Sequence, residues 1–456
     1  MWRASIPERI IPTHPTALDE SKGEALQNLI QRARSASNGD QQGDIRDSQS
    51  WNEILAVLRQ DLDVVSKSLS GPMGQINLSQ LFPTSLFYYL EKQDEQKNPS
   101  WKRRMHRFCP GINIDEVNYL NDALYLAELA YETTVDSIKA GLDDANDPLE
   151  LVYCTIEGES CRPAHFVALK RNQSVWSSAL EVVMVVRGTS SITDAITDAM
   201  CNPVDYRGGK AHAGILESGK YLAVTHVELL ENLRRMSGKR KVKLTLVGHS
   251  LGAGAAAIAG MELKACQSNF DVKVIGFGCP ALLSEDLSKA VSSYMTTVIG
   301  DSDLVPRMSG ATIGNLLLDI QEYNYVPNAR RDIEQAFDEL EYVSPGILSK
   351  GFVDGLMHTV DSLFENIVDP TIKPATVERS VPVLFPPGRC VHFYRDGYGV
   401  TGSVTPCKLF SEIDLSRRMI DDHLITPGYR QIFLDLMRQY HNDQHFSFSE
   451  VRPGKN

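Results

Sequence analysis

Short, continuous apolar runs separated by helical patterns dominate the chain from about residue 115 onward. Such runs are typical of strands in a sheet that is covered on both faces, because neither side of the strand then meets water. The predicted strands are 149–156, 164–171, 182–187, 242–247, 272–277, 295–299, 379–384 and 390–394. Helical segments alternate with them, from 115–131 to 429–440. The pattern predicts a doubly wound α/β fold with a mostly parallel central sheet.

Two regions depart from this rhythm. Residues 1–110 show helix-like segments between polar stretches and are predicted to form a helical, partly disordered leader. Residues 311–378 are amphipathic and helical, and they are predicted to be an insertion in the α/β domain. The domain itself is assigned to 111–445, which leaves a tail at 446–456.

Composition restricts the class of protein. The chain has 456 residues, a net charge of −12 and 42% hydrophobic residues, as is ordinary for a globular protein. The acidic excess argues against nucleic acid as a partner. Two short basic runs, 102–104 and 239–241, fit solvated faces better than lipid contacts.

Cysteine usage and hydropathy indicate the compartment. The eight cysteines are scattered without CxxC or His-rich spacing, so free thiols and no metal site are expected. Cys154 and Cys161 bracket a predicted hairpin and are the one pair considered for a bridge. No export signal and no run of about eighteen apolar residues is visible, which predicts a cytoplasmic protein without a transmembrane segment, at most peripheral to membranes.

The most informative motif is Gly248-His-Ser-Leu-Gly252, between an apolar strand and a run of small residues. This is the layout of a nucleophile elbow, in which glycines flank a serine on a tight strand-to-helix turn. Ser250 is therefore the candidate nucleophile. The alternative is an ordinary glycine-flanked turn.

An activated serine needs a base and an acid. In enzymes with a nucleophile elbow, an aspartate or glutamate follows the serine in the chain, and the histidine comes after it. Asp303 follows a predicted strand and is the candidate acid, with Asp301 as the second choice and a turn or helix cap as the alternative role. His423 lies just before the last helix and is the candidate base. The other histidines after Asp303 are assigned to surface or core positions: 358, 392, 441 and 445.

Two donors are expected to stabilise the oxyanion. One is the backbone N–H of Leu251, directly after the nucleophile. The other is Thr189, which follows the strand at 182–187 and can offer both N–H and hydroxyl. Gly188 would let this backbone approach the site closely, although a simple β-turn is the alternative.

The ordered motifs resemble the class 3 lipases, the fungal triacylglycerol lipase group, and more narrowly the sn-1-specific diacylglycerol lipases. They comprise Val186–Ser191, Asp194–Asp198, His212–Ile215, Leu246–Gly254, Leu282–Asp286, Asp303–Arg307, Phe385–Arg389 and Asp422-His423. The resemblance implies an α/β-hydrolase fold, a Ser250–Asp303–His423 triad and an oxyanion hole of Thr189 and Leu251. It also implies calcium dependence, for which no ligand cluster is visible, and no other cofactor is expected.

The segment 190–204 corresponds in position to the lid of the class 3 lipases, the segment that covers the active site. Ile192, Ile196 and Met200 lie on one face of a predicted amphipathic helix that could cover the pocket in water. The alternative is a helix packed into the core.

The predicted function is a serine lipase that hydrolyses acylglycerols at a membrane or droplet surface, with diacylglycerol as the first candidate substrate. Phospholipase A1, triacylglycerol lipase and monoacylglycerol lipase activities are the alternatives within the enzyme class. A non-catalytic lipid-binding protein on a hydrolase fold is the alternative outside it. The sequence gives no indication of the oligomeric state.

Overall fold

The computed structural model describes residues 88–93, 101–174, 176–189, 203–343, 358, 362, 382–416 and 418–449. The predictions for the lid residues Ile192, Ile196 and Met200 lie outside this part of the chain. Most of the leader and much of the second half of the insertion also lie outside it.

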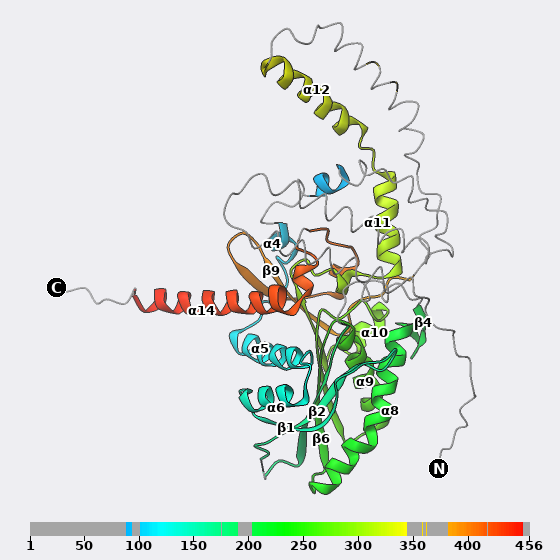
Figure 1. Ribbon diagram of the computed structural model, residues 1–456, viewed down its shortest axis with the longest axis vertical. Coiled ribbons are helices and arrows are strands. Elements are labelled where there is room, and N and C mark those ends of the chain that lie inside the picture. The colour runs from blue at the N-terminus through cyan, green and yellow to red at the C-terminus, as the bar shows by residue number, and fades with distance from the viewer. Residues whose placement is uncertain are drawn as a thin grey trace, which may run out of the picture. The chain divides into compact units, whose positions relative to one another are not determined.

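The described residues form an eight-stranded sheet in the order β1-β2-β3-β6-β7-β8-β9-β10 (Figure 1). Neighbouring strands from β3 to β9 are parallel, whereas the β1–β2, β2–β3 and β9–β10 pairs are antiparallel. The predicted α/β fold with a mostly parallel central sheet is therefore confirmed. The strands are β1 (Leu149–Thr155), β2 (His165–Lys170), β3 (Ala179–Val186), β6 (Lys241–His249), β7 (Phe270–Phe277), β8 (Met295–Gly300), β9 (Arg389–Arg395) and β10 (Val400–Thr405).

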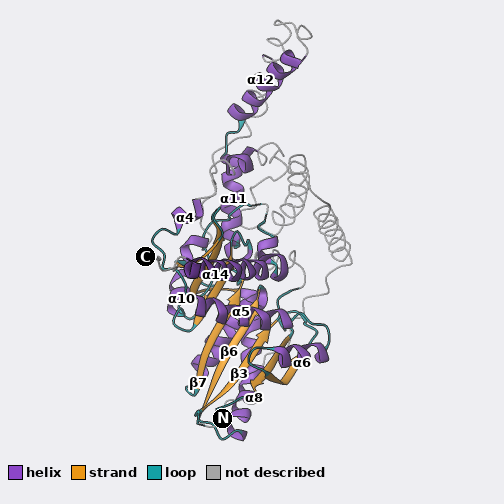
Figure 2. Ribbon diagram, turned by 90° about the vertical axis from the view of Figure 1, so that its left-hand side faces the viewer, coloured by secondary structure: helices purple, strands orange, loops and turns teal. Residues whose placement is uncertain are grey.

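Helices cover both faces of the sheet, which explains the continuous apolar runs (Figure 2). In β6, Leu246 packs in the core cluster that also holds α8 (Ala213–Met236) and α9 (Leu251–Cys266). The next residue, Val247, packs in a second cluster on the opposite face. That cluster contains α5 (Ile114–Leu129), α6 (Val135–Asp144) and the start of α14 (Gln431–Ser449). Because successive strand residues point to opposite faces, both must be apolar here.

The remaining elements are short. They are α4 (Trp101–Met105), the hairpin β4 (Pro203–Tyr206) and β5 (Gly209–His212), α10 (Glu285–Ala290), η2 (Val305–Arg307), η5 (Cys407–Phe410), η6 (Asp421–His423) and the π-helical turn η7 (Ile425–Arg430). In the predicted insertion, α11 (Gly310–Glu322) and α12 (Val326–Val343) are helical as expected. Ser309 and Thr312 form a reciprocal capping box that starts α11. Within the described residues, no helix combines the length and apolar character needed to cross a membrane.

One predicted strand is wrong. In the stretch 379–384, the residues that the structure describes (382–384) form no strand, and Phe385 makes only an isolated bridge to Leu283. Proline is the physical reason, because Pro382 has no N–H to donate to a ladder. The following prolines serve instead as acceptors, since the Ser288 hydroxyl donates to the Pro386 carbonyl at 2.7 Å.

The stretch 101–112, which lies around the predicted end of the leader, packs against the edge of the sheet. Val404 N–H in β10 donates to the Pro110 carbonyl at 2.8 Å, and Gly111 bridges to Ser403. On the N-terminal side of this contact, α4 lies beside β9 (Figure 1). Residues before the first strand therefore belong to the packed structure.

Candidate active site

Ser250 stands on a strained turn between β6 and α9. Its φ of 56° and ψ of −133° place it in a conformation that non-glycine residues rarely adopt. The turn is so tight that a Cβ on Gly248 would lie 2.6 Å from the Gly252 carbonyl carbon. A Cβ on Gly252 would collide with the backbone of Val186 and Arg187. The two glycines are thus required by close backbone approach, as expected for a nucleophile elbow.

The structure brings His423 and Asp303 to this serine. His423 Nε2 lies 2.9 Å from Ser250 Oγ, and His423 Nδ1 lies 2.9 Å from Asp303 Oδ1. His423 is in the turn η6, and Asp303 follows β8. The side chains are buried, with exposed fractions of 3% for His423 and 0% for Asp303. Asp301, the second choice for the acid, pairs instead with Lys102 and Arg395.

Two further groups fix the Asp303 carboxylate. The Tyr429 hydroxyl donates to Oδ2 at 2.6 Å, and the Val305 backbone N–H donates to Oδ1 at 2.9 Å. Burial, followed by the charge of Asp303, raises the pKa of Tyr429 well above its usual value. The phenol therefore remains a donor at neutral pH, and the carboxylate is held with one oxygen toward His423.

An ionic cluster links the acid loop to the base loop. Ser302 N–H donates to Asp422 Oδ2 at 3.2 Å, and Asp422 directly precedes His423. Arg395 Nη1 bonds both Asp301 Oδ2, at 2.8 Å, and Asp422 Oδ1, at 3.0 Å. Burial and the neighbouring Asp301 charge raise the pKa of Asp422 to about 6, whereas Arg395 and Arg418 oppose this shift.

The loop after β3 lies directly against the elbow. A Cβ on Gly188 would be 2.6 Å from the His249 carbonyl oxygen and 2.9 Å from Ser250 Cβ, so only glycine fits without movement. The Tyr131 hydroxyl bonds His249 Nδ1 at 2.8 Å, and His249 Nε2 lies 2.8 Å from the His423 carbonyl oxygen. Burial lowers the pKa of His249 to about 3. The ring is therefore neutral, with Nε2–H donating to His423 and Nδ1 accepting from Tyr131.

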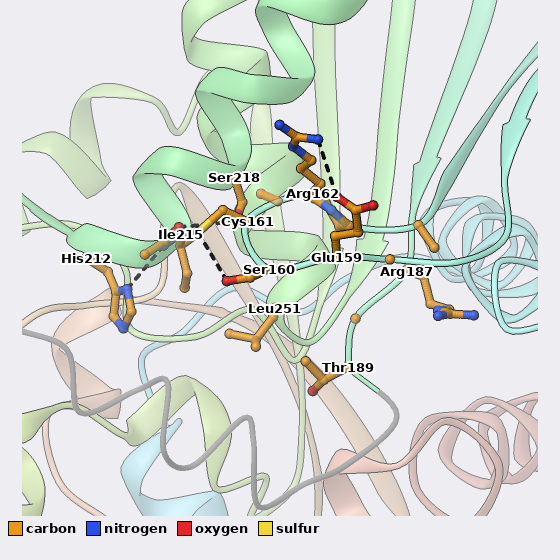
Figure 3. A pocket seen from close by; sticks show the side chains of 17 residues that line it. Glu159, Ser160, Cys161, Arg162, Arg187, Thr189, His212, Ile215, Ser218 and Leu251 are labelled. Carbon is orange, nitrogen blue, oxygen red and sulfur yellow. Dashed lines mark hydrogen bonds and ion pairs between the residues drawn. The ribbon is translucent and has the colours of Figure 1, made fainter. Parts of the chain in front are cut away.

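A cavity of about 320 Å³ opens beside these groups (Figure 3). Thr189 and Leu251, the predicted oxyanion donors, lie next to each other on its wall, and Arg187 points away from them. The tip of the β1–β2 hairpin, including Ser160 and Cys161, lines another side together with the first turns of α8 and α9. The cavity therefore adjoins the residues that follow Ser250 and the loop after β3.

Several residues of the site were missed by sequence reasoning. Tyr131, Tyr429, Arg395 and Lys102 carry no local signal. The partners named above lie more than a hundred positions away, except that Arg395 is 94 positions from Asp301 and 27 from Asp422. His392, assigned to the core, is buried and bonds both His106 and the Asp301 carbonyl.

The described residues show neither a cluster of metal ligands nor a disulfide. This part of the chain contains no group of three or more His, Cys, Asp or Glu side chains able to hold a metal ion. Its seven cysteines are free, including Cys154 and Cys161.

Residues 183–313 match the family model of the class 3 lipases. The chain is 25% identical to rat (Rattus norvegicus) diacylglycerol lipase-alpha over 70% of this chain and 31% of that protein. It is 31% identical to mouse (Mus musculus) diacylglycerol lipase-beta over 30% of this chain and 21% of that protein. The chain thus spans less than a third of the length of these relatives.

The likeness to a solved structure is low. The triacylglyceride lipase of Rhizomucor miehei is 23% identical, with a TM-score of 0.35 and coverage of 43% of this chain and 76% of that one. The fold assignment therefore depends on the sheet order and the elbow. The matched segment contains the Ser250 elbow and Asp303. The predicted resemblance is confirmed: residues 183–313 match the class 3 lipases, and a longer stretch of the chain is similar to diacylglycerol lipase-alpha.

Proposed function

We propose that this protein is a serine lipase that cleaves an ester bond of an acylglycerol through an acyl-enzyme on Ser250. One observation carries the proposal: a single imidazole, His423, lies within 2.9 Å of both the Ser250 hydroxyl and the Asp303 carboxylate. A hydroxyl is a weak nucleophile unless such a base takes its proton.

The reaction follows from this arrangement. His423 Nε2 takes the proton of Ser250 Oγ as Oγ bonds to the ester carbonyl carbon. Asp303 orients the ring through Nδ1–H and stabilises the imidazolium. The imidazolium then gives its proton to the departing glyceride oxygen, which leaves the acyl group on Ser250. A water molecule, activated by the same imidazole, releases the fatty acid and restores the serine.

The developing oxyanion is assigned to the backbone N–H of Leu251 and to Thr189. Leu251 is the first residue of α9, and the first N–H groups of a helix have no partner within the helix. Gly188 packs its backbone against Ser250, which supports a donor from the next residue, Thr189. Both donors lie at the wall of the 320 Å³ cavity.

Diacylglycerol is the first candidate substrate. The relatives named above are diacylglycerol lipases, and the alignment with the alpha enzyme covers 70% of this chain. Phospholipase A1, triacylglycerol lipase and monoacylglycerol lipase activities remain alternatives, since these substrates present the same ester to the serine. A lid at 190–204, carrying Ile192, Ile196 and Met200, is part of the proposal.

The proposed setting is a lipid surface in contact with the cytoplasm. The seven free thiols support a reducing compartment. The proposed chemistry needs no cofactor. Calcium is tested separately, by assaying the protein in chelator and in calcium buffer.

A fluorophosphonate probe tests the enzyme class. The native protein should be labelled covalently, and Ser250→Ala should abolish the label while leaving the circular dichroism spectrum unchanged. Ser403→Ala is a matched control, because Ser403 is also buried but lies on β10. An unlabelled native protein would support the non-catalytic lipid-binding alternative.

A substrate panel tests the class of lipid. Purified protein is incubated with diacylglycerol, triacylglycerol, monoacylglycerol and phosphatidylcholine, and the released chain and its position are identified. Diacylglycerol should be hydrolysed with the highest kcat/KM and lose its sn-1 chain. A higher value for any other lipid would replace the proposed substrate.

A further inference from the structure

The two faces of the segment from α4 to Phe108 differ sharply. Lys102 and His106 are buried, and they bond residues of the sheet and of the acid loop. Between and after them the side chains of Arg103, Arg104 and Met105, and then of Arg107 and Phe108, are exposed. The basic run 102–104 is thus a solvated face only in part, since Lys102 points inward.

The exposed face combines cations with large apolar groups. Phe108 is 90% exposed, and Tyr398, on the β9–β10 turn, is 79% exposed. The Arg103 guanidinium lies 4.6 Å from the Tyr398 ring centre, which joins the two segments into one surface. We call this surface the α4 patch: Arg103, Arg104, Met105, Arg107, Phe108 and Tyr398.

Charge complementarity indicates what the α4 patch contacts. Asp396 neutralises Arg103, but Arg107 has no ion pair among the described residues. The chain as a whole carries a net charge of −12, so the arginines form a local basic surface on an acidic protein. Arginines beside exposed aromatic side chains suit the anionic headgroups and the interfacial region of a membrane.

The α4 patch lies at the carboxyl ends of the parallel strands. We call this end of the sheet the catalytic edge, because the candidate catalytic residues follow these strands. Lys102 contacts Asp301 and Ser302, which follow the carboxyl end of β8, and Ser250 follows the carboxyl end of β6. In a parallel sheet these ends share one edge. Figures 1 and 2 both show α4 beside the end of the sheet that lies away from the last turns of α8.

A second surface of similar composition lies at the opposite edge. Trp176 is 94% exposed and Met236 is 87% exposed, and Arg240 and Lys241 are exposed as well. The Arg240 N–H donates to the Ser178 carbonyl at 2.8 Å, which joins the two segments. Trp176 precedes β3 and Arg240 precedes β6, so this surface is at the amino ends of the parallel strands. We call it the opposite patch, and it provides a matched comparison.

We propose that the α4 patch docks the protein on anionic lipid surfaces and thereby presents the catalytic edge to the membrane. The proposal extends the function proposed above, because a serine that acts on lipids must face the surface in which they lie. The buried contacts of Lys102 and His106 connect the docking element to the loop that carries Asp303.

Vesicle co-sedimentation tests the proposal with the full chain. The native protein should bind vesicles of phosphatidylcholine and phosphatidylserine more tightly than vesicles of phosphatidylcholine alone, and added salt should weaken the difference. Arg107→Gln should weaken binding to the anionic vesicles about fivefold and leave binding to neutral vesicles unchanged. Phe108→Ser should weaken binding to both kinds roughly tenfold.

The opposite patch supplies the controls. Arg240→Gln and Trp176→Ser remove the same kinds of side chain and should leave binding within about twofold of the native value. Equal affinity of the native protein for the two vesicle types would overturn the proposal. An Arg107→Gln protein that binds anionic vesicles as tightly as the native protein would also overturn it. So would substitutions at the opposite patch that weaken vesicle binding as much as those at the α4 patch.

Hydrolysis of a soluble short-chain ester separates docking from catalysis. Arg107→Gln should retain the native rate on this ester and full fluorophosphonate labelling, but should hydrolyse diacylglycerol in anionic vesicles more slowly. Ser250→Ala should lose both activities and keep vesicle binding. Failure of the docking proposal therefore leaves the proposed enzyme class standing, and the converse also holds.

Discussion

At position 188 the structure leaves no room for a side chain. The His249 carbonyl, the Tyr131 hydroxyl and Ser250 Cβ would all lie between 2.6 and 2.9 Å from an added Cβ. Gly188→Ala must therefore displace the loop that carries Thr189, because the elbow is held on its other side by β7. We expect kcat to fall roughly a hundredfold, the loss typical of a displaced oxyanion donor.

Steady-state kinetics and thermal unfolding check this prediction together. Gly310→Ala is the matched control, since an added Cβ there meets nothing within 4 Å. A Gly188→Ala enzyme with native kcat would contradict the assignment of Thr189.

Tyr429 is expected to act through Asp303. Tyr429→Phe removes a 2.6 Å donor to Oδ2 and leaves the buried carboxylate with fewer partners. Hydrogen bonds to charged groups contribute about 1.5–3 kcal/mol, so kcat should fall at least roughly tenfold while KM changes little. Tyr325→Phe, a buried tyrosine in a separate cluster, should retain the native kcat. Equal effects of the two substitutions would reduce Tyr429 to a packing role.

At the scale of elements, α4 is joined to the catalytic loops by one buried cation. Lys102 bonds Ser302 Oγ at 2.8 Å, contacts the Asp301 carboxylate and lies 3.7 Å from Asp414 Oδ2. Lys102→Met should lower the free energy of unfolding by about 3 kcal/mol, because buried carboxylates lose their counter-ion. It should also lower kcat, since Asp301 is two residues from Asp303.

Chemical rescue separates the charge from the fold. Lys102→Cys should be impaired, and alkylation with bromoethylamine, which restores an ammonium group, should recover kcat. Lys239→Met is the control, because Lys239 holds only loop carbonyls, those of Ser174 and Ser177. Recovery of stability without recovery of kcat would confine Lys102 to a structural role.

Some of the strands and turns could be predicted from the sequence, and others could not. The central strands and the elbow are local signals, since an apolar run and two glycines four positions apart specify them directly. By contrast, β10 (Val400–Thr405) alternates apolar and small polar residues and was not predicted, as is common for an edge strand. The strand prediction for 379–384 was wrong at 382–384, the part that the structure describes, because hydropathy ignores the missing N–H of Pro382.

The candidate site was predictable where chain order limits the choice. Ser250 has a motif, and the order acid, then histidine, selects Asp303 and His423 from several alternatives. Contacts such as Tyr131 to His249 or Lys102 to Asp301 join residues 118 and 199 positions apart. No periodicity or spacing encodes such a pairing, because it depends on how the finished elements pack.

For the whole molecule, the site is assembled from parts far outside the 183–313 segment. Tyr131 comes before the first strand, and His423 and Tyr429 follow the last. The pairing of β9 with β8 connects the two loops, because Arg395 at the end of β9 bonds both Asp301 and Asp422. The lipase-like segment therefore contains the proposed nucleophile and the proposed acid, whereas the proposed base and the supporting residues come from both flanks.

Buried histidines make the whole fold sensitive to acid. Burial lowers the pKa of His226 to about 4 and that of His249 to about 3, and it also lowers the pKa values of His106, His165 and His392. In the unfolded chain these rings titrate near pH 6.5. As the pH falls below 6.5, these histidines therefore bind protons in the unfolded state but stay neutral in the folded state.

Each such histidine should reduce the free energy of unfolding by about 1.4 kcal/mol per pH unit, until its folded-state pKa is reached. Asp422 has the opposite effect on the pH dependence of stability, because its pKa is raised to about 6. It is a single group, whereas five buried histidines lower the stability in acid. Stability should therefore fall steeply between pH 6.5 and 4, as measured by urea unfolding. His226→Gln should flatten this slope by about 1.4 kcal/mol per unit, whereas the same change at the exposed His358 should leave it unaltered. A stability that does not change across this interval would mean that these rings are protonated in the folded protein.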